Sequence, residues 1–470
     1  MKSLFVTALL LLCFSCGFTA RGGGNNAFLV KDIWAGSHSS APDQMISVNN
    51  IVFFRAYEPV NGTALWKSDG TAQGTVMLRD NTSPMNFAKL GNLVVFRSGD
   101  VPYRSDGTAA GTFELCSGTY AYNFTCVNDV IFFSYSDRDS SRPPPWSPFG
   151  NELWRSDGTT ANTYVVKDIN PGKADAFPRY LTNVNGILFF TAYDGVHGGE
   201  LWKSDGTEAG TVPVKDIVPG TYGSMNTSPY GTYAEFQGQF FFSASDGVHG
   251  QELWKSDGTA SGTVLVKDIN PGPTGGFVPE TGRFKKAGGK LFFTASDGVH
   301  GMELWVSDGT EQGTHIVKDI NPGSSGADVF ALVSLRDFLC FTAYSPDYGY
   351  ELWRTNGTEE GTYLVKDICP GPGSSAPGGI CAQGRLYFAA SDGVYGYELW
   401  TSDGTPEGTF RLTDIVPGPG GSYPDYFAAT DDLLFFAADD GVHGEELWVI
   451  PLLPYPKAPA SAQSAWWRRY

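Results

Sequence analysis

The sequence predicts an all-β fold: a single closed β-propeller of about nine four-stranded blades, with eight blades as the alternative. Three observations predict it, namely a motif at a nearly constant interval, glycine-punctuated apolar segments, and chain ends that complement each other. An aromatic residue marks the motif at Trp66, Tyr103, Trp154, Trp202, Trp254, Trp305, Trp353, Trp400 and Trp448. Seven of the eight intervals are 47 to 52 residues, and the other is 37. A period near 48 lies in the range of propeller blades.

The composition agrees with this fold. Glycine accounts for 59 of 470 residues, aromatic residues for 14% and charged residues for only 17%. This combination is typical of a turn-rich β protein rather than of a disordered chain. The formal net charge of -18 repels nucleic acid and anionic membranes, so neither is an expected partner.

One repeat unit, residues 283–320, shows the expected strands. A weak segment near Arg283 is followed by "LFFTAS", "ELWVS" and "THIVKDI", with "AGG", "DGVHG" and "DGTEQG" as turns between them. "LFFTA" is apolar on successive residues, so both of its faces must be buried. A blade packed between two other blades meets that requirement. The doubtful unit is the second, where Val101-Pro102-Tyr103 replaces Glu-Leu-Trp and the spacing is short.

The last hairpin of each unit has a predicted register. If the chain turns after Thr310, Trp305 faces Ile316 and Glu303 faces Lys318. We expect each such Glu–Lys pair to contribute about 0.2–1 kcal/mol. The same offset recurs in Glu152–Lys167, Glu200–Lys215, Glu252–Lys267 and Glu351–Lys366.

The two ends of the repeat array complement each other. Trp448 is followed by "VIPLLP" without a returning strand, whereas "AFLVKDI", from Ala27, reads as a fourth strand that lacks the first three. We therefore predict a ring closed by pairing of these ends, which leaves no exposed sheet edge. The predicted propeller covers residues 27–452, and the Pro- and Ala-rich tail 453–470 is expected to be disordered.

Residues 1–20 have the pattern of a secretory signal peptide: Lys2, then an apolar run too short to span a bilayer. Cleavage after Gly17 fits as well as cleavage after Ala20. The expected location is therefore extracellular or at the cell surface, and no other segment is long and apolar enough to cross a membrane.

The repeated "ELWKSDGT..GT..VKDI", at Glu200 and Glu252 for example, resembles the ELWxxDGT repeat of large secreted and surface proteins. The resemblance covers Phe28 to Trp448, with "ELW" and "SDGT" each intact seven times. It implies a β-propeller and supplies no catalytic residues.

The repeated polar residues have structural interpretations. Aspartate before glycine caps a turn by accepting backbone N–H bonds, and we expect this of Asp69, Asp106, Asp157, Asp205, Asp257, Asp308 and Asp403. Calcium binding by these loops is the alternative, although they lack the alternating acidic ligands of a calcium loop. The "DGVHG" histidines, one per blade, are too far apart around a ring to form a metal site; they are His197, His249, His300 and His443. We expect no metal site and no cofactor.

The cysteines and the glycosylation sequons suggest an oxidising, extracellular setting. Cys116 and Cys126 stand in places equivalent to Cys369 and Cys381, which predicts two disulfides, Cys116–Cys126 and Cys369–Cys381. Cys340, in an apolar segment, is expected to be an inert buried thiol. In a eukaryotic host the candidate N-glycosylation sites are Asn61, Asn81, Asn123, Asn226 and Asn356.

Two irregular segments are the best candidates for a binding site. They are residues 136–150, "SDRDSSRPPPWSPFG", and residues 221–236, "TYGSMNTSPYGTYAEF". Loops on a rigid scaffold commonly carry binding, and aromatic rings stack on sugars. The candidate side chains are Trp146, Tyr222, Tyr230 and Tyr233. Neutral variation of loops is the alternative interpretation.

No catalytic constellation stands out from the repeat, so the catalytic residues are unknown and an enzyme is not the favoured interpretation. We expect a secreted, monomeric propeller that binds an extracellular protein or glycan. The alternative is a polysaccharide lyase or glycoside hydrolase with its site at the mouth of the channel. His315 and Arg336, both outside the repeat pattern, are the first residues to check for it.

Overall fold

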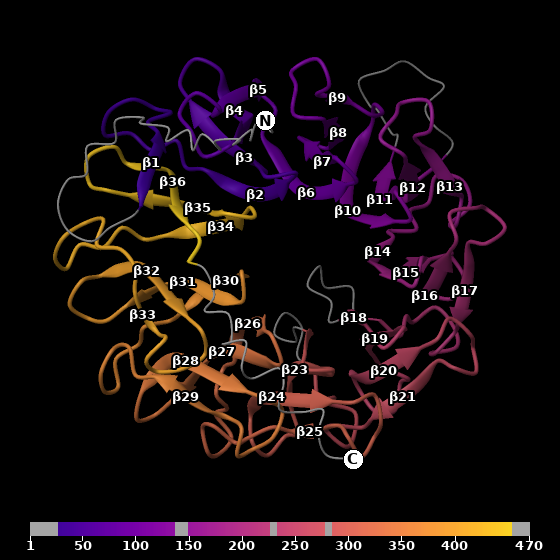
Figure 1. Cartoon of the computed structure of the whole chain (residues 1–470). Coiled ribbons are helices and arrows are strands. Elements are labelled where there is room, and N and C mark those ends of the chain that lie inside the picture. The colour runs from indigo at the N-terminus through magenta and orange to yellow at the C-terminus, as the bar shows by residue number, and fades with distance from the viewer. Residues whose placement is uncertain (1–26, 137–148, 226–232, 278–283, 454–470) are drawn as a thin grey trace, which may run out of the picture.

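The computed structural model describes residues 27–136, 149–225, 233–277 and 284–453. These residues form nine four-stranded antiparallel sheets arranged in a ring, a nine-bladed β-propeller (Figure 1). The described residues contain no helix, and so none that could span a membrane. The predicted fold is confirmed, and the doubtful second unit is a complete blade.

In blades 1 to 8 the four strands follow the chain order from the centre of the ring outward (Figure 1). Blade 1 comprises β2 (Asp43–Val48), β3 (Ile51–Glu58), β4 (Gly62–Ser68) and β5 (Val76–Arg79). Blade 2 comprises β6 (Pro84–Leu90), β7 (Leu93–Ser98), β8 (Val101–Ser105) and β9 (Phe113–Glu114). Blade 3 comprises β10 (Thr119–Val127), β11 (Val130–Ser136), β12 (Glu152–Ser156) and β13 (Tyr164–Lys167).

Blade 4 comprises β14 (Arg179–Val184), β15 (Ile187–Tyr193), β16 (Gly199–Ser204) and β17 (Val212–Lys215). Blade 5 comprises β18 (Tyr233–Phe236), β19 (Gln239–Ala244), β20 (Glu252–Ser256) and β21 (Val264–Lys267). Blade 6 comprises β22 (Lys285–Ala287), β23 (Lys290–Ser296), β24 (Met302–Ser307) and β25 (His315–Ile316).

Blade 7 comprises β26 (Phe330–Leu335), β27 (Phe338–Ser345), β28 (Gly349–Thr355) and β29 (Tyr363–Lys366). Blade 8 comprises β30 (Gly378–Ala382), β31 (Arg385–Ser391), β32 (Tyr397–Ser402) and β33 (Phe410–Arg411). Blade 9 combines β34 (Asp425–Ala429), β35 (Leu433–Asp439) and β36 (Glu445–Pro451) with β1 (Phe28–Lys31).

The first strand closes the ring. β1 lies beside β36 as the outer strand of blade 9, and Leu29 is opposite Trp448 (Figure 1). The predicted closure by the chain ends is therefore confirmed. Val30 is buried, and Phe28 and Ile33 pack against the core between blades 9 and 1.

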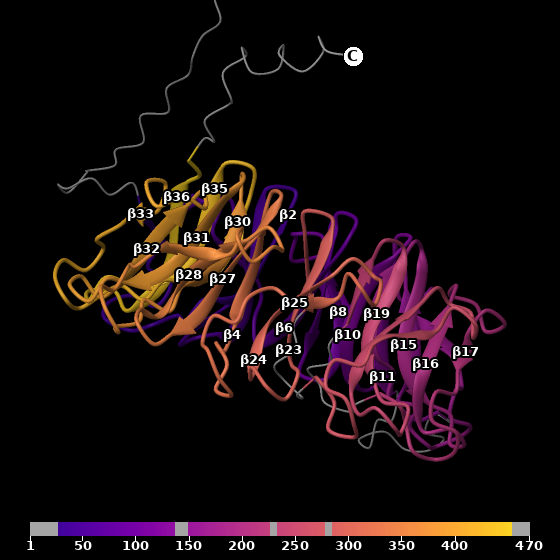
Figure 2. The same cartoon turned by 90° about the horizontal axis from the view of Figure 1, so that it is seen from below.

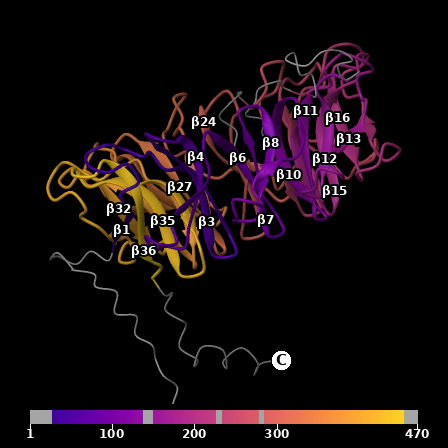
Figure 3. The ribbon, with the colours of Figure 1, turned by 90° about the horizontal axis from the view of Figure 1, so that it is seen from above.

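The core lies between the blades. β23 is buried on both faces, as its unbroken apolar run predicts. Phe292 and Leu304 of blade 6 pack with Phe341 and Trp353 of blade 7, and equivalent clusters fill the other junctions. Seen from its edge, the ring is a disc with the strands crossing its thickness (Figures 2 and 3).

The "SDGT" turns are held as predicted. Asp308 Oδ1 accepts hydrogen bonds from Thr310 N at 2.8 Å and Thr310 Oγ1 at 2.7 Å, and these bonds lower the pKa of Asp308. Gly309 has a φ of 90°, and a Cβ there would lie 3.2 Å from the Phe241 ring of blade 5. Glycine therefore fits both the backbone and the space. The turn role of the aspartates is confirmed.

The predicted register is confirmed in part. Trp305 is opposite Ile316. The predicted Glu–Lys pairs are wrong, however, because the pairing shifts by one residue beside the tryptophan, so that Lys366 is opposite Leu352 rather than Glu351. The lysine instead reaches the neighbouring blade: Lys366 Nζ donates to Thr409 O at 2.7 Å. It therefore joins two blades rather than two strands.

The glutamates of the motif are buried and hold the links between blades. Glu303 Oε2 accepts a hydrogen bond from Ile320 N at 3.3 Å, and Oε1 accepts one from Asn321 N at 3.2 Å. Burial raises the pKa of Glu303 to about 7 despite these bonds. Equivalent buried carboxyls occur at Glu152, Glu200, Glu252, Glu351, Glu398 and Glu446.

Candidate functional site

The two faces of the disc differ. The middle hairpin turns of the blades and the links from one blade to the next lie on the same face, which we call the link face. The "SDGT" turns lie on the opposite face, because each strand reverses the chain direction. Ser136, at the end of β11, and Thr221, in the link after β17, therefore lie on the link face at blades 3 to 5. The rest of the first irregular segment up to residue 148, and residues 226–232 of the second, lie outside the described residues.

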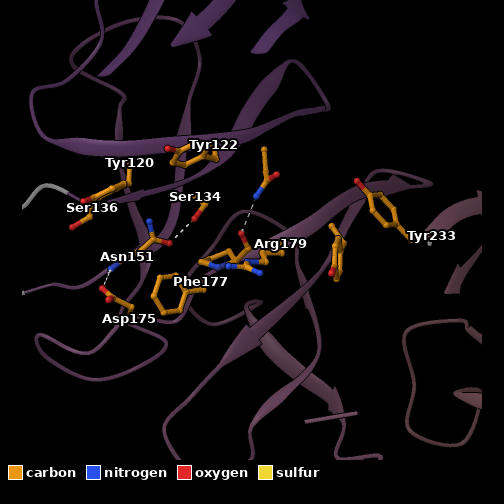
Figure 4. A pocket seen from close by; sticks show the side chains of 12 residues that line it. Tyr120, Tyr122, Ser134, Ser136, Asn151, Asp175, Phe177, Arg179 and Tyr233 are labelled. Carbon is orange, nitrogen blue, oxygen red and sulfur yellow. Dashed lines mark hydrogen bonds between the residues drawn. The ribbon is translucent and has the colours of Figure 1, made fainter. Parts of the chain in front are cut away.

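A pocket of about 560 Å³ opens at this place, and we call it the aromatic pocket. Its volume lies within the usual range for small-molecule sites, about 300–1,000 Å³. The walls come from β10, β11, β14 and β18, from the hairpin turn before β12 and from the link before β14 (Figure 4). The aromatic lining residues are Tyr120, Tyr122, Phe177, Tyr180 and Tyr233, and the polar ones include Asn123, Ser134, Asn151, Asp175 and Arg179.

The polar floor of the aromatic pocket is held by short hydrogen bonds. Asn151 Oδ1 accepts a bond from Ser134 Oγ at 2.5 Å, and Asn151 N donates to Asp175 Oδ1 at 2.7 Å (Figure 4). Asn123 Nδ2 donates to Pro178 O at 3.3 Å and so ties blade 3 to the link before blade 4. These bonds fix the polar groups before any ligand arrives.

A buried carboxyl lies behind the floor. Glu152 Oε2 accepts from Ile169 N at 2.9 Å and Oε1 from Asn170 N at 3.2 Å. Asn170 Nδ2 in turn donates to Asp175 O at 2.9 Å. Burial raises the pKa of Glu152 to about 8. Glu152 contacts no pocket space itself, but it positions the link that carries Asp175 and Phe177.

The backbone presents several aromatic side chains from a left-handed conformation. Tyr120 and Tyr180 have φ values of 65° and 59°, and Phe177 has a φ of 45°. Such angles are uncommon for bulky residues, and they tend to occur where surrounding structure enforces them. Left-handed residues recur at equivalent places in other blades, for example Gln44 and Tyr426, so the bend belongs to the frame.

Tyr180 and Tyr233 form an aromatic pair between blades 4 and 5. Their ring centroids are 5.1 Å apart at 39°. Burial raises the pKa of Tyr180 to about 12. Both hydroxyls are therefore neutral at physiological pH, and each can donate as well as accept a hydrogen bond.

The candidate residues from the sequence have different outcomes. Tyr233 lines the aromatic pocket. Tyr222 is 81% exposed and is not part of the pocket wall. Trp146 and Tyr230 lie outside the described residues. Four further aromatic residues of the pocket were not predicted: Tyr120, Tyr122, Phe177 and Tyr180. The available signal for the first two is the aromatic-rich segment "TYAYNF" at the start of blade 3.

The residues named for an enzymatic alternative are not brought together. His315 is on β25, the outer strand of blade 6, and is exposed. Arg336 follows the inner strand of blade 7, on the face of the "SDGT" turns, and its Nη2 donates to Gly384 O at 3.1 Å. Neither lines the aromatic pocket.

The ring of each "DGVHG" histidine is hydrogen-bonded to the aspartate of its own turn. His197 Nδ1 lies 2.7 Å from Asp194 Oδ2, and this contact raises the pKa of His197. Equivalent pairs are His249–Asp246, His300–Asp297 and His443–Asp440. Among the described residues, no group of three or more His, Cys, Asp or Glu side chains is placed to hold a metal ion.

The two predicted disulfides are absent, which corrects the sequence analysis. Cys126 and Cys381 are each the penultimate residue of an innermost strand, β10 or β30, whereas Cys116 and Cys369 lie in the preceding links. Cys381 lies three residues beyond the start of β30, and Cys126 lies further along β10. Three strand residues already cover about 10 Å, which exceeds the Cα separation of about 7 Å that a disulfide allows. Sequence spacing did not reveal that a strand lies between the partners. Cys340 is fully buried, as predicted, and burial raises its pKa to about 12.

The sequons have unequal surroundings. Asn81, Asn123 and Asn356 are exposed, Asn61 is partly buried, and Asn226 lies outside the described residues. Asn123 lines the aromatic pocket, so a glycan there would compete with a ligand. Asn356 takes the place of the turn aspartate, and its Oδ1 accepts from Thr358 N at 3.0 Å.

Another cavity of the link face, on the other side of the ring, has a different chemistry. It lies between blades 9 and 1, has a volume of about 440 Å³, and we call it the acidic pocket. Four of its lining residues are carboxylates: Asp43, Asp425, Asp439 and Glu445. Burial and the neighbouring carboxylates of Asp425, Asp439 and Asp43 raise the pKa of Glu445. Asp43 is paired with Arg55.

No protein-family model matches this chain, and no curated protein does. Among solved structures, the chain is similar to a computationally designed protein at 14% identity and a TM-score of 0.43, covering 88% of this chain and 98% of that one. It is similar to prolyl endopeptidases at 14% identity and a TM-score of 0.42, covering 77% of this chain and 54% of theirs.

The β-propeller domain of the Trilobed protease from Pyrococcus furiosus is similar at 9% identity and a TM-score of 0.39, covering 80% of this chain and 98% of that domain. Against puromycin hydrolase this chain spans 58% of the length. At such identities the likeness concerns the propeller fold alone.

Proposed function

We propose that this propeller is a secreted recognition module that binds a glycan in the aromatic pocket. The observation that carries the proposal is the lining: five aromatic side chains face a cavity whose polar groups are already fixed by hydrogen bonds. Sugars offer apolar C–H faces to aromatic rings and hydroxyls to amides and carboxylates. A mostly apolar pocket with a few placed polar groups suits such a ligand.

Exposed aromatic area supports binding rather than folding as the role of these residues. Tyr120 is 56% exposed and Phe177 is 43% exposed, whereas most large apolar side chains of the described residues are buried. The resemblance to secreted repeat proteins and the signal-like residues 1–20 favour an extracellular location. A protein ligand and a polysaccharide-acting enzyme are the competing functions.

The test is a glycan array followed by calorimetry and an assay for new reducing ends. We expect binding of at least one glycan class and no turnover. Tyr120→Ala and Tyr233→Ala should each weaken binding at least tenfold. Tyr164→Ala is the matched control, because Tyr164 is a comparably exposed tyrosine on the outer strand of blade 3. Turnover of a polysaccharide would replace this proposal with an enzyme, and silence on the array would favour a protein ligand.

A further inference from the structure

A second cavity adjoins the aromatic pocket. Its volume is about 420 Å³, and its wall includes Tyr193, Val196 and Thr221 on the side of blades 4 and 5. We call it the second pocket. Asp175, Phe177 and Arg179 line both pockets, so the two cavities are separated by a wall only one layer of side chains thick.

Phe177 forms a fixed ridge between them. Its backbone is left-handed, and its N–H donates to Asn151 O at 3.2 Å. The Arg179 guanidinium lies 5.9 Å from the Phe177 ring centroid (Figure 4). With 43% of its surface exposed, the ring is open to a ligand that crosses from one pocket to the other.

The charges of this groove balance. Among the described residues that line the two pockets, the charged side chains are Asp175 and Arg179, one of each sign. The remainder of the chain is strongly acidic, with a net charge of -18. A polyanion would be repelled on approach and would find a single cation in the groove.

We propose that the aromatic pocket and the second pocket are two subsites of one groove for a linear, uncharged oligosaccharide of at least two sugar residues, which crosses Phe177. This inference rests on the proposed function and extends it by specifying the charge and the minimum length of the ligand. Two adjoining subsites act as linked binding sites, so occupancy of the first raises the effective concentration of the chain at the second.

The test is titration calorimetry with neutral gluco-, manno-, xylo- and galacto-oligosaccharides of one to six residues, with oligogalacturonates as the charged probe. For the series that binds, we expect at least a tenfold gain in affinity between one and three residues, and no binding of the oligogalacturonates.

Thr221→Arg fills the second pocket from an exposed loop position. It should abolish the gain with length while leaving the affinity for the shortest bound ligand within twofold. Tyr193→Ala gives an independent check on the same subsite. Thermal melting of each variant confirms that it is folded.

The outcomes separate the two proposals. A monosaccharide that binds as tightly as the hexamer, or a Thr221→Arg variant that keeps the full gain with length, overturns the two-subsite inference and leaves glycan binding intact. Tighter binding of oligogalacturonates overturns the neutral class. Absence of binding to every saccharide at every length overturns the proposed function itself.

Discussion

The aromatic pocket and the acidic pocket occupy similar places on the link face but differ in chemistry. Phe177 and Tyr423 each precede an inner strand with a left-handed backbone, at φ values of 45° and 49°. The N–H of Phe177 donates to Asn151 O at 3.2 Å, and that of Tyr423 donates to Tyr397 O at 3.1 Å. The backbone frame is therefore the same.

The side chains on that frame differ. The first residue of the inner strand is Arg179 in blade 4 and Asp425 in blade 9. Around Arg179 the wall is aromatic, whereas around Asp425 it is carboxylate-rich. The repeat therefore specifies where a pocket forms, and the residues outside the motif specify the chemistry of its lining.

The largest expected effect comes from deleting residues 27–33, which removes β1. Figure 1 shows β1 across the ring from β10, β14 and β18, the strands that contribute to the aromatic pocket. Loss of about three buried apolar side chains costs on the order of 5 kcal/mol. Because the ring closes through β1, we expect the whole propeller to lose its single cooperative melting transition in calorimetry. An unchanged transition would show that closure by β1 does not stabilise the ring.

Removal of a buried carboxyl should distinguish a glutamate that only stabilises the fold from one that also positions the aromatic pocket. Glu152→Ala and Glu303→Ala each leave two backbone N–H groups without an acceptor, and each should cost about 2–4 kcal/mol of unfolding free energy in urea. Only Glu152→Ala should also weaken ligand binding, because Glu152 holds the link that carries Phe177. Equal effects of both variants on binding would contradict a positioning role.

The pH dependence of the unfolding free energy tests the raised pKa of the same carboxyls, and the expected change is smaller. Burial raises the pKa of Glu152 to about 8 and that of Glu303 to about 7, above the ordinary value of 4.5. The folded state favours the protonated form of each of these carboxyls. Their contribution to stability is therefore fully present below about pH 4.5 and is lost as the pH rises to 7–8.

We therefore expect the unfolding free energy, measured in urea, to fall by on the order of 1–3 kcal/mol per carboxyl between pH 5 and pH 8. Glu303→Gln should reduce this fall, because the amide does not titrate. A variant with the same pH dependence as the original protein would show that Glu303 is already ionised at pH 5.

The sequence predicts the frame well because the frame repeats. The motif that contains Trp305 and Asp308 recurs along the chain, so each copy supports the same interpretation. The pairing of the chain ends was indicated by the incomplete repeat unit at each end. The Glu–Lys pairs and the disulfides fail for one reason: both require knowledge of which blade or which face a side chain reaches. Lys366 contacts the next blade, and Cys381 lies a strand away from Cys369.

The lining of the aromatic pocket could be predicted from the sequence only in part. Of the two irregular segments, the described residues that line the aromatic pocket are Ser136 and Tyr233. Tyr233 was identified, but Phe177 and Tyr180 were not, because their place in the pocket wall depends on a left-handed backbone that the sequence of non-glycine residues does not indicate. Juxtaposition of three blades creates the pocket, and no single segment contains it.

The most direct test of the central claim is a matched pair of variants, Phe177→Ala and Tyr423→Ala, measured for affinity to the neutral oligosaccharide that binds best. Both residues are exposed aromatics on the same backbone conformation, at 43% and 62%. We expect at least a tenfold loss of affinity for Phe177→Ala and a change within twofold for Tyr423→Ala, with similar melting temperatures. Equal losses in both variants, or no loss in either, would contradict this expectation.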